Sequence, residues 1–267
     1  MIPPRLLSFT CCALLCAQIS FSVCHADDSN FETVKKSAKQ GDAEAQIKVA
    51  GAYFQGEGVP KDYQQAVEWI RKAADQGNAK AQYDLGLFYR RGFGVQRDLV
   101  EAVNWYRKSG EQDFVEAELE LGRLFYSGDT GIAQNYPEAR KWLTKAAEHG
   151  KAWAQNTLGV IYLSGYGVET DPKQAFGWFQ RAAELGNAKA QSNVGQMYAE
   201  GTGVERDLVK AYQWLTLAAQ QGEVTAPKML VGVEPNLTSD QIAEGKRLVA
   251  EWKQLAGKNS TQKSSER

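Results

Sequence analysis

The sequence predicts an all-α fold, a right-handed α-solenoid of about five αα-hairpins with helical caps at both ends. Two observations on the 267-residue chain predict it, a recurring loop glycine and a recurring tryptophan. Both repeat every 36 or 37 residues, at Gly56, Gly92, Gly128, Gly165 and Gly201 and at Trp69, Trp105, Trp142, Trp178 and Trp214. A fixed period of this length indicates stacked repeats, in which each unit buries its apolar side against its neighbours. We therefore expect all five tryptophans to lie in the core.

Each unit contains two amphipathic helical patterns on either side of a glycine-bearing turn. In the second unit, apolar residues recur at helical spacing on both sides of the turn at 91–95, at Ala81, Leu85 and Tyr89 and then at Ala102, Trp105 and Tyr106. Glycines in the turn accept positive φ and end the first helix. The unit is therefore expected to be an αα-hairpin.

The second helix of each unit has a start signal and a stop signal. The expected N-cap residues are Asp62, Asp98, Asn135, Asp171 and Asp207. Glu101 follows Asp98 at capping-box spacing, and Pro172 occupies the first helical position after Asp171. Four of these helices end at a glycine able to adopt the left-handed conformation, at Gly77, Gly150, Gly186 and Gly222.

The repeated motif is Ala-x-Ala-Gln-x-x-Leu-Gly-x-x-Tyr, then Gly-x-Gly-Val, Asp-x-x-x-Ala-x-x-Trp and Ala-Ala-x-x-Gly. It resembles the Sel1-like repeat, one of the tetratricopeptide-type α-solenoids. The resemblance covers five units, at 43–78, 79–114, 115–151, 152–187 and 188–223. It implies a scaffold or adaptor that works through protein–protein contacts.

Segments outside the repeats are assigned from their local patterns. Residues 27–42 contain one short amphipathic helix and are predicted to be an N-terminal cap. Residues 224–256 are predicted to hold C-terminal capping helices, the last opened by a capping box of Thr238 and Gln241. The polar tail at 257–267 is expected to be disordered.

The junction between the second and third units departs from the motif. Ser109 and Gly110 stand where other units have two alanines, and Asp113 replaces the closing glycine. Gly110 lowers helix propensity by about 1 kcal/mol relative to alanine. This junction is predicted to be the softest place in the array, through neutral drift or as a hinge.

The first 26 residues are predicted to be a cleavable Sec-type signal, cut near Ala26-Asp27. Arg5 precedes an apolar stretch, and an uncleaved membrane anchor is the alternative. All four cysteines lie within this segment, so the mature chain would contain none. The sequence therefore predicts a periplasmic or secreted protein without stable membrane insertion after cleavage.

Charge and motif content favour a non-enzymatic protein. After cleavage the chain would carry 30 basic and 32 acidic residues, which gives no reason to expect nucleic acid as a partner. The one remaining histidine, His149, precedes Gly150 and is interpreted as a helix-terminus residue. We expect no cofactor and no metal. Some cysteine-rich Sel1-like proteins hydrolyse β-lactams, but their disulfides are not possible in a cysteine-free mature chain.

The resemblance also implies where a partner binds, because the first helix of each such unit lines the concave side. The groove positions carried over are Tyr83, Leu87, Arg90, Leu119, Arg123, Tyr126, Trp153, Asn156 and Val160. Trp153 stands where the other units carry a charged residue, at Glu44, Lys80, Glu116 and Lys189. It is interpreted either as a binding hot spot or as a packing residue against the extended loop of the third unit.

The sequence therefore predicts an exported monomer whose concave groove binds a protein or an extended peptide. Regulation of an envelope complex or a sensor fits this class. A solenoid that recognises peptidoglycan or another glycan is the alternative, because exposed aromatic residues in a groove would serve that purpose as well.

Overall fold

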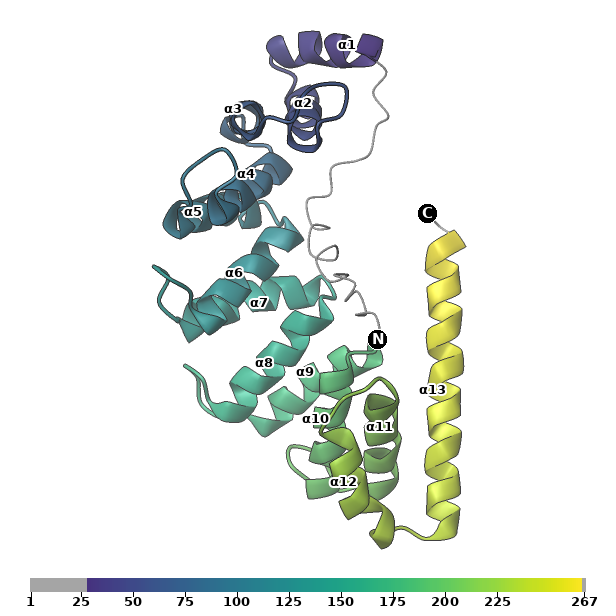
Figure 1. The fold of residues 1–267 in the computed structure, drawn as a ribbon. Helices are drawn as coiled ribbons and strands as arrows, with labels where there is room; N and C mark the ends of the chain where they lie inside the picture. Colours follow the sequence, from purple (N-terminus) through teal and green to yellow (C-terminus); the bar gives the residue numbers. More distant parts are fainter. Residues whose placement is uncertain (1–27, 266–267) are drawn as a thin grey trace, which may run out of the picture. The chain divides into compact units, whose positions relative to one another are not determined.

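The computed structural model describes residues 28–265, so the predicted leader lies outside the described part of the chain. Thirteen α-helices and one short 3₁₀-helix follow one another over this range (Figure 1). Within it there is no β-strand, and the single β-bridge joins Asp129 to Ile132 in the loop of the third repeat. The predicted all-α class is confirmed, whereas the right-handed turn of the array stays a prediction.

The helices of the repeats have nearly uniform lengths. The first helices are α2 (Ala43–Gln55), α4 (Ala79–Arg91), α6 (Val115–Ser127), α8 (Ala152–Ser164) and α10 (Ala188–Glu200). The second helices are α3 (Tyr63–Asp75), α5 (Leu99–Gly110), α7 (Tyr136–Glu148), α9 (Pro172–Glu184) and α11 (Leu208–Gln220). The two helices of a repeat pack on one another, as in α2 with α3, α6 with α7, α8 with α9 and α10 with α11. In the second repeat, a Cβ on Gly86 of α4 would lie 2.6 Å from the Tyr106 ring of α5, so each repeat is the expected αα-hairpin.

The chain divides into two compact parts that each contain several hairpin repeats: the first unit ends at Ser109, and the second unit begins at Gly110. The division falls at the two residues where the sequence predicts the softest junction. Both replacements also have local packing reasons. Ser109 Oγ donates a hydrogen bond of 2.6 Å to the Ala79 carbonyl, and a Cβ on Gly110 would lie 2.9 Å from the Trp142 ring.

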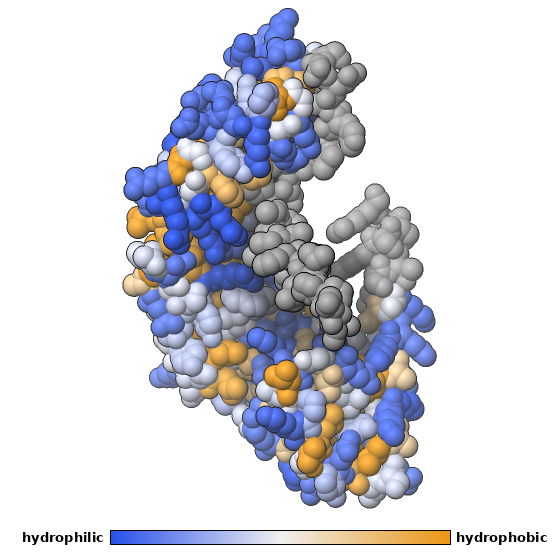
Figure 2. All heavy atoms as spheres, in the orientation of Figure 1, coloured by the Kyte–Doolittle hydropathy of each residue, from blue (hydrophilic) through white to orange (hydrophobic). Residues whose placement is uncertain are grey.

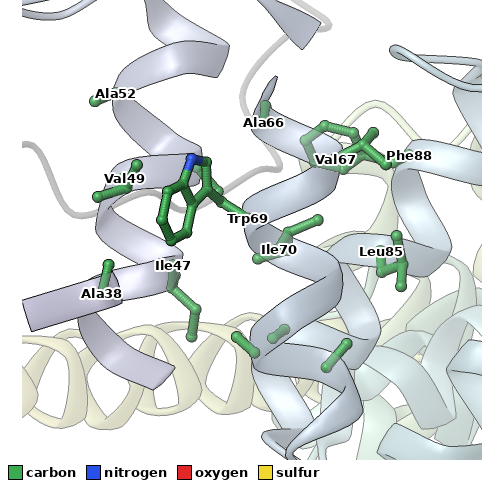
Figure 3. Close-up of a cluster of buried hydrophobic side chains, with 14 of the residues drawn as sticks. Ala38, Ile47, Val49, Ala52, Ala66, Val67, Trp69, Ile70, Leu85 and Phe88 are labelled. Atoms are coloured by element: carbon green, nitrogen blue, oxygen red, sulfur yellow. The ribbon is translucent and has the colours of Figure 1, made fainter. Parts of the chain in front are cut away.

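The core of the first unit is built around the repeating tryptophan. Figure 3 shows the Trp69 indole between α2 and α3, with Val49 and Ile47 on the facing helix. Trp69 is 6% exposed, and Ile70 beside it is fully buried. A large ring on one helix thus fills the space that small residues leave on the next, as expected for close-packed repeats.

The second unit repeats this arrangement with one exception. Trp142 and Trp214 are buried, as are Trp69 and Trp105 in the first unit. Trp178 is only half-buried, with the Arg181 guanidinium 4.8 Å from its ring centroid. The prediction that all five tryptophans lie in the core is wrong for this residue. The next residue, Phe179, is 1% exposed and holds the core position that Ile70, Tyr106, Leu143 and Leu215 hold in the other repeats, whereas the Trp178 ring stays at the surface beside Arg181.

Two kinds of glycine allow the helices to approach closely. A Cβ on Gly159, in the middle of α8, would lie 2.5 Å from the ring of Phe179 on the second helix of the same hairpin. The second glycine of the Gly-x-Gly loop contacts the preceding repeat: a Cβ on Gly94 would lie 2.1 Å from the Tyr63 carbonyl oxygen. The motif therefore fixes both the packing within a hairpin and the packing between hairpins.

The expected caps are present. Each predicted N-cap side chain accepts at least one backbone N–H from the first turn of its helix, for Asp62, Asp98, Asn135, Asp171 and Asp207. The capping box at Asp98 is incomplete because the Asp98 N–H donates to the Tyr89 carbonyl, at 3.0 Å. Asp113 takes the left-handed conformation of the glycine that it replaces, with φ of 58°.

Terminal helices cover both ends of the repeats. At the N-terminal end, α1 (Asp28–Lys39) buries Phe31 and Ala38 against the first repeat. At the other end, α12 (Ala226–Val233), the 3₁₀-helix η1 (Glu234–Asn236) and α13 (Ser239–Ser265) follow α11. Trp252 on α13 packs edge-on against Trp214, with ring centroids 6.3 Å apart.

The last helix extends beyond the end predicted from the sequence. The expected end was residue 256, followed by a disordered tail at 257–267, but α13 continues to Ser265. The physical reason is that no proline follows Gly257, and a single glycine lowers helix propensity by only about 1 kcal/mol. None of the helices between residues 28 and 265 combines the length and the apolar character needed to cross a lipid bilayer.

Candidate functional site

A surface hollow of about 370 Å³ lies in the second unit, between α6, α8, α10 and the start of α12. Its lining residues are Tyr126, Trp153, Asn156, Thr157, Val160, Asn187, Lys189, Ser192, Asn193, Glu223 and Thr225. Four of these, Tyr126, Trp153, Asn156 and Val160, were predicted as groove residues. On the face of the molecule drawn in Figure 2, hydrophobic residues of the described part are scattered among hydrophilic ones.

Trp153 and Arg123 meet at the edge of the hollow. The Arg123 guanidinium lies 4.7 Å from the centroid of the Trp153 ring, and the ring itself is half-buried. The register explains this contact, because the two residues lie on the first helices of adjacent repeats. Such a cation–π contact holds the indole in one orientation and leaves the guanidinium hydrogens able to bind an acceptor.

Two asparagines form a hydrogen-bonded pair in the hollow. Asn193 Nδ2 donates to Asn156 Oδ1 at 3.1 Å. Asn156 is 9% exposed, so its side chain is held in place by packing as well. Each amide has two donors and an acceptor carbonyl, and this contact uses one donor of Asn193 and the carbonyl of Asn156. The pair therefore still offers a donor from Asn156 and an acceptor from Asn193.

Hydroxyl groups on the opposite side are also fixed. The Ser192 and Thr225 hydroxyls share a hydrogen bond of 3.0 Å, and Thr225 Oγ1 donates to Glu223 at 2.9 Å. On the other wall, burial raises the pKa of Tyr126 above its ordinary value, so this phenol stays neutral and can donate or accept. The hollow thus presents neutral polar groups and the Glu223 carboxylate in defined positions, with exposed Lys189 at its rim.

The remaining predicted groove residues are placed less favourably for contact. Tyr83 and Leu87 in the first unit are each 6% exposed, and the Tyr83 ring packs 5.6 Å from that of Tyr106. Arg90 and Leu119 are half-exposed. A partner could therefore reach less of Tyr83 and Leu87 than of Trp153, whereas Arg90 and Leu119 are exposed to a similar degree but do not line the hollow.

Sequence reasoning missed several residues of the hollow. Thr157 and Asn193 share one register position, directly after the predicted groove position of their helix, and Asn187 is the N-cap residue of α10. The signal was present in the register, because two consecutive helix positions can face the same side of a repeat. Glu223 and Thr225 lie beyond α11, the last second helix, at and just after the end of the fifth repeat.

His149 lies where the sequence predicts it, as the C-cap residue of α7. It does not line the hollow. Between residues 28 and 265, no group of three or more histidine, cysteine, aspartate or glutamate side chains is arranged to hold a metal ion.

Comparison with known proteins agrees with this architecture. A family model described as Sel1 repeat matches residues 43–78, 79–114, 115–151, 154–187 and 188–223. No curated protein matches the chain. A Sel1 repeat protein from Oxalobacter formigenes, known by crystal structure, is 34% identical with a TM-score of 0.64, over 84% of this chain and 90% of that one.

A second solved structure is c5321, a protective antigen present in uropathogenic Escherichia coli strains. It is 32% identical with a TM-score of 0.52, and the match covers 85% of this chain but 56% of the antigen. The five family matches and the packing of the hairpins lead to one conclusion: this chain belongs to the Sel1 repeat family.

Proposed function

We propose that this protein is a non-enzymatic scaffold that binds an extended segment of a partner protein in the hollow of its second unit. The observation that carries this proposal is the Arg123–Trp153 stack beside the Asn156–Asn193 pair. An orientated aromatic ring with a neighbouring arginine is the residue content typical of a binding hot spot.

The asparagine pair favours a peptide over other ligands. An extended peptide presents N–H and C=O groups alternately along its backbone, and each needs a partner when it is removed from water. The free donor of Asn156 and the free acceptor of Asn193 satisfy one group of each kind. Recognition of the backbone would set the direction of the segment, and Trp153 would contact one of its side chains.

A glycan fits the same hollow less well. Sugars stack on an open aromatic face, and in this structure the Arg123 guanidinium covers one face of Trp153. Within the described part of the chain, the lining of the hollow contains no histidine or cysteine, and its one carboxylate, Glu223, accepts from the Thr225 hydroxyl. These features support a binding role.

The predicted leader supports a periplasmic or secreted location, and a cysteine-free mature chain suits it. In that compartment the protein would act as a monomer and regulate an envelope complex or a sensor. The family, with its repeated helical hairpins, supplies an extended surface for such contacts.

Photo-crosslinking in cells tests the proposal. A photoreactive residue would replace Trp153, and the control would replace Lys173, an exposed residue on α9 outside the hollow. Lys189 holds the position of Trp153 in the fifth repeat but is unsuitable as a control, because it also lines the hollow. We expect one dominant protein adduct from position 153 that is absent from position 173.

Two outcomes would count against the proposal. Adducts confined to the chain itself would make Trp153 a packing residue. Displacement of the adduct by soluble muropeptides would favour the glycan alternative.

A further inference from the structure

A buried glutamine connects each repeat to the helix before it. Its side-chain amide donates to the backbone carbonyl eight residues earlier, at the end of the preceding helix. The four bonds run from Gln46 to Ala38 at 3.0 Å, Gln82 to Ala74 at 3.2 Å, Gln155 to Ala147 at 2.9 Å and Gln191 to Ala183 at 3.2 Å. This recurring bond pins the start of each first helix in place.

The third repeat has Glu118 at this position. Its side chain is fully buried, and neither carboxylate oxygen has a hydrogen-bond partner. An ionised carboxylate has no hydrogen to donate to the matching carbonyl, that of Gly110. The Gly110 carbonyl accepts from the Asp113 N–H at 3.2 Å and, in place of a glutamine amide, from Lys145 Nζ at 3.3 Å. The third repeat therefore lacks the bond that its four counterparts share.

A second substitution accompanies the first. In the first and fifth repeats, the glutamine carbonyl accepts from another glutamine at the end of the second helix: Gln76 to Gln46 at 2.8 Å and Gln221 to Gln191 at 2.7 Å. The third repeat has His149 at that position, and its Nε2 lies 3.9 Å from Glu118 Oε2. Both members of a neutral amide pair are thus replaced by groups that bind protons.

The charged groups around Glu118 and His149 belong to two segments. On α7, Lys145 Nζ lies 3.9 Å from Glu118 Oε1, with Glu148 nearby. In the loop before α6, Asp113 accepts from Lys145 Nζ at 2.8 Å, and Glu111 also acts on this lysine. Burial raises the pKa of Glu118, while His149 and Lys145 partly oppose this effect. The lysine is shared with Asp113 and does not fully compensate the buried carboxylate.

We infer that Glu118 and His149 form a proton-dependent clasp in the third repeat. A proton bound by the pair supplies the donor that the glutamine amide supplies elsewhere. On Glu118 it forms an O–H that can donate to the Gly110 carbonyl, and on His149 it forms an imidazolium that pairs with the carboxylate. The half-exposed imidazole gives this proton a path to water. The clasp is the hydrogen bond or ion pair that needs this proton, so it forms as pH falls and is lost as pH rises.

The experiment compares wild type with Glu118→Gln and with the double variant Glu118→Gln/His149→Gln, which restores the amide pair of the first and fifth repeats. Thermal midpoints of the full chain would be measured between pH 5 and pH 8. We expect the thermal midpoint of wild type to fall relative to that of each variant by at least about 2 °C as pH rises. The reason is that only wild type loses the proton bound by Glu118 and His149.

The matched control is Glu116→Gln, because Glu116 lies on α6 like Glu118 but its carboxylate is exposed and pairs with Lys151, the N-cap residue of α8. Its gap to wild type should change less over this range. Carbon-detected NMR should also show the Glu118 carboxyl titrating above the range of exposed glutamates. A constant gap for both clasp variants, or a Glu118 carboxyl that titrates like Glu116, would overturn the inference. None of these residues lines the hollow, so the outcome is independent of partner binding.

Discussion

The buried carboxyl group of Asp84 offers a quantitative test of the packing in the first unit. Asp84 lies on α4 and is 2% exposed, and its Oδ2 atom has no hydrogen-bond partner. Burial raises its pKa from 3.8 to about 7, with a small opposing effect of Lys80. The matching residues of the fourth and fifth repeats, Thr157 and Asn193, are neutral. We therefore consider the substitution Asp84→Asn.

The sign follows from proton binding. Because the pKa of Asp84 is higher in the folded state, the folded chain binds more protons than the unfolded chain between about pH 4 and pH 7. The contribution of Asp84 to the free energy of unfolding is therefore retained at low pH and lost as pH rises through about 7. With folded and unfolded pKa values of about 7 and 3.8, the loss from pH 5 to pH 8 is about 2.5 kcal/mol.

The assay is urea unfolding of wild type and Asp84→Asn, followed by circular dichroism at pH 5 and pH 8. We expect the stability advantage of the variant to grow by about 2.5 kcal/mol over this interval, whatever the packing effect of the amide itself. Asp75→Asn is the control, because Asp75 is an exposed acid on α3 of the same unit. Equal pH dependence in wild type and Asp84→Asn would refute the reasoning.

Three further predictions follow from the structure. Combined substitution Arg123→Ala and Trp153→Ala should abolish partner capture and shift the thermal midpoint by less than about 3 °C, since the pair lies at the edge of the hollow; a larger loss would make both residues structural. Gly94→Ala should destabilise the chain by at least about 2 kcal/mol more than Gly131→Ala in urea unfolding, because both have positive φ but only a Cβ on Gly94 meets backbone atoms. Asn156→Leu should weaken partner binding at least about 5-fold in calorimetry, since it leaves a backbone group of the partner unpaired; unchanged affinity would exclude the amide pair from recognition.

Much of the fold could be predicted from the sequence because the same helix-start, turn and apolar-spacing signals recur in five repeats. Helix starts at residues such as Asp62 and turns such as that at Gly92 depend on local chemistry, and the structure agrees with both. The half-buried state of Trp178 could not be predicted, because the motif is the same at this position in every repeat and the other four tryptophans are buried. The extension of α13 to Ser265 was missed because composition alone suggested disorder.

The candidate site was predictable only in part. The register identified Trp153 and Asn156, but Asn193 pairs with Asn156 from the adjacent repeat, and such a contact depends on how two helices are staggered. Glu118 and His149 are each unremarkable along the chain. Only the structure shows that they lie close together, at the positions where the first and fifth repeats have a hydrogen-bonded glutamine pair.

The central claim is that the hollow of the second unit binds an extended segment of a partner protein. The most direct test is calorimetric titration of a synthetic peptide, taken from the segment crosslinked at position 153, into wild type and Trp153→Ala. The account predicts saturable one-to-one binding to wild type and an affinity at least about 30-fold weaker for the variant, as expected for loss of a hot-spot residue. Equal affinities for the two proteins would contradict it.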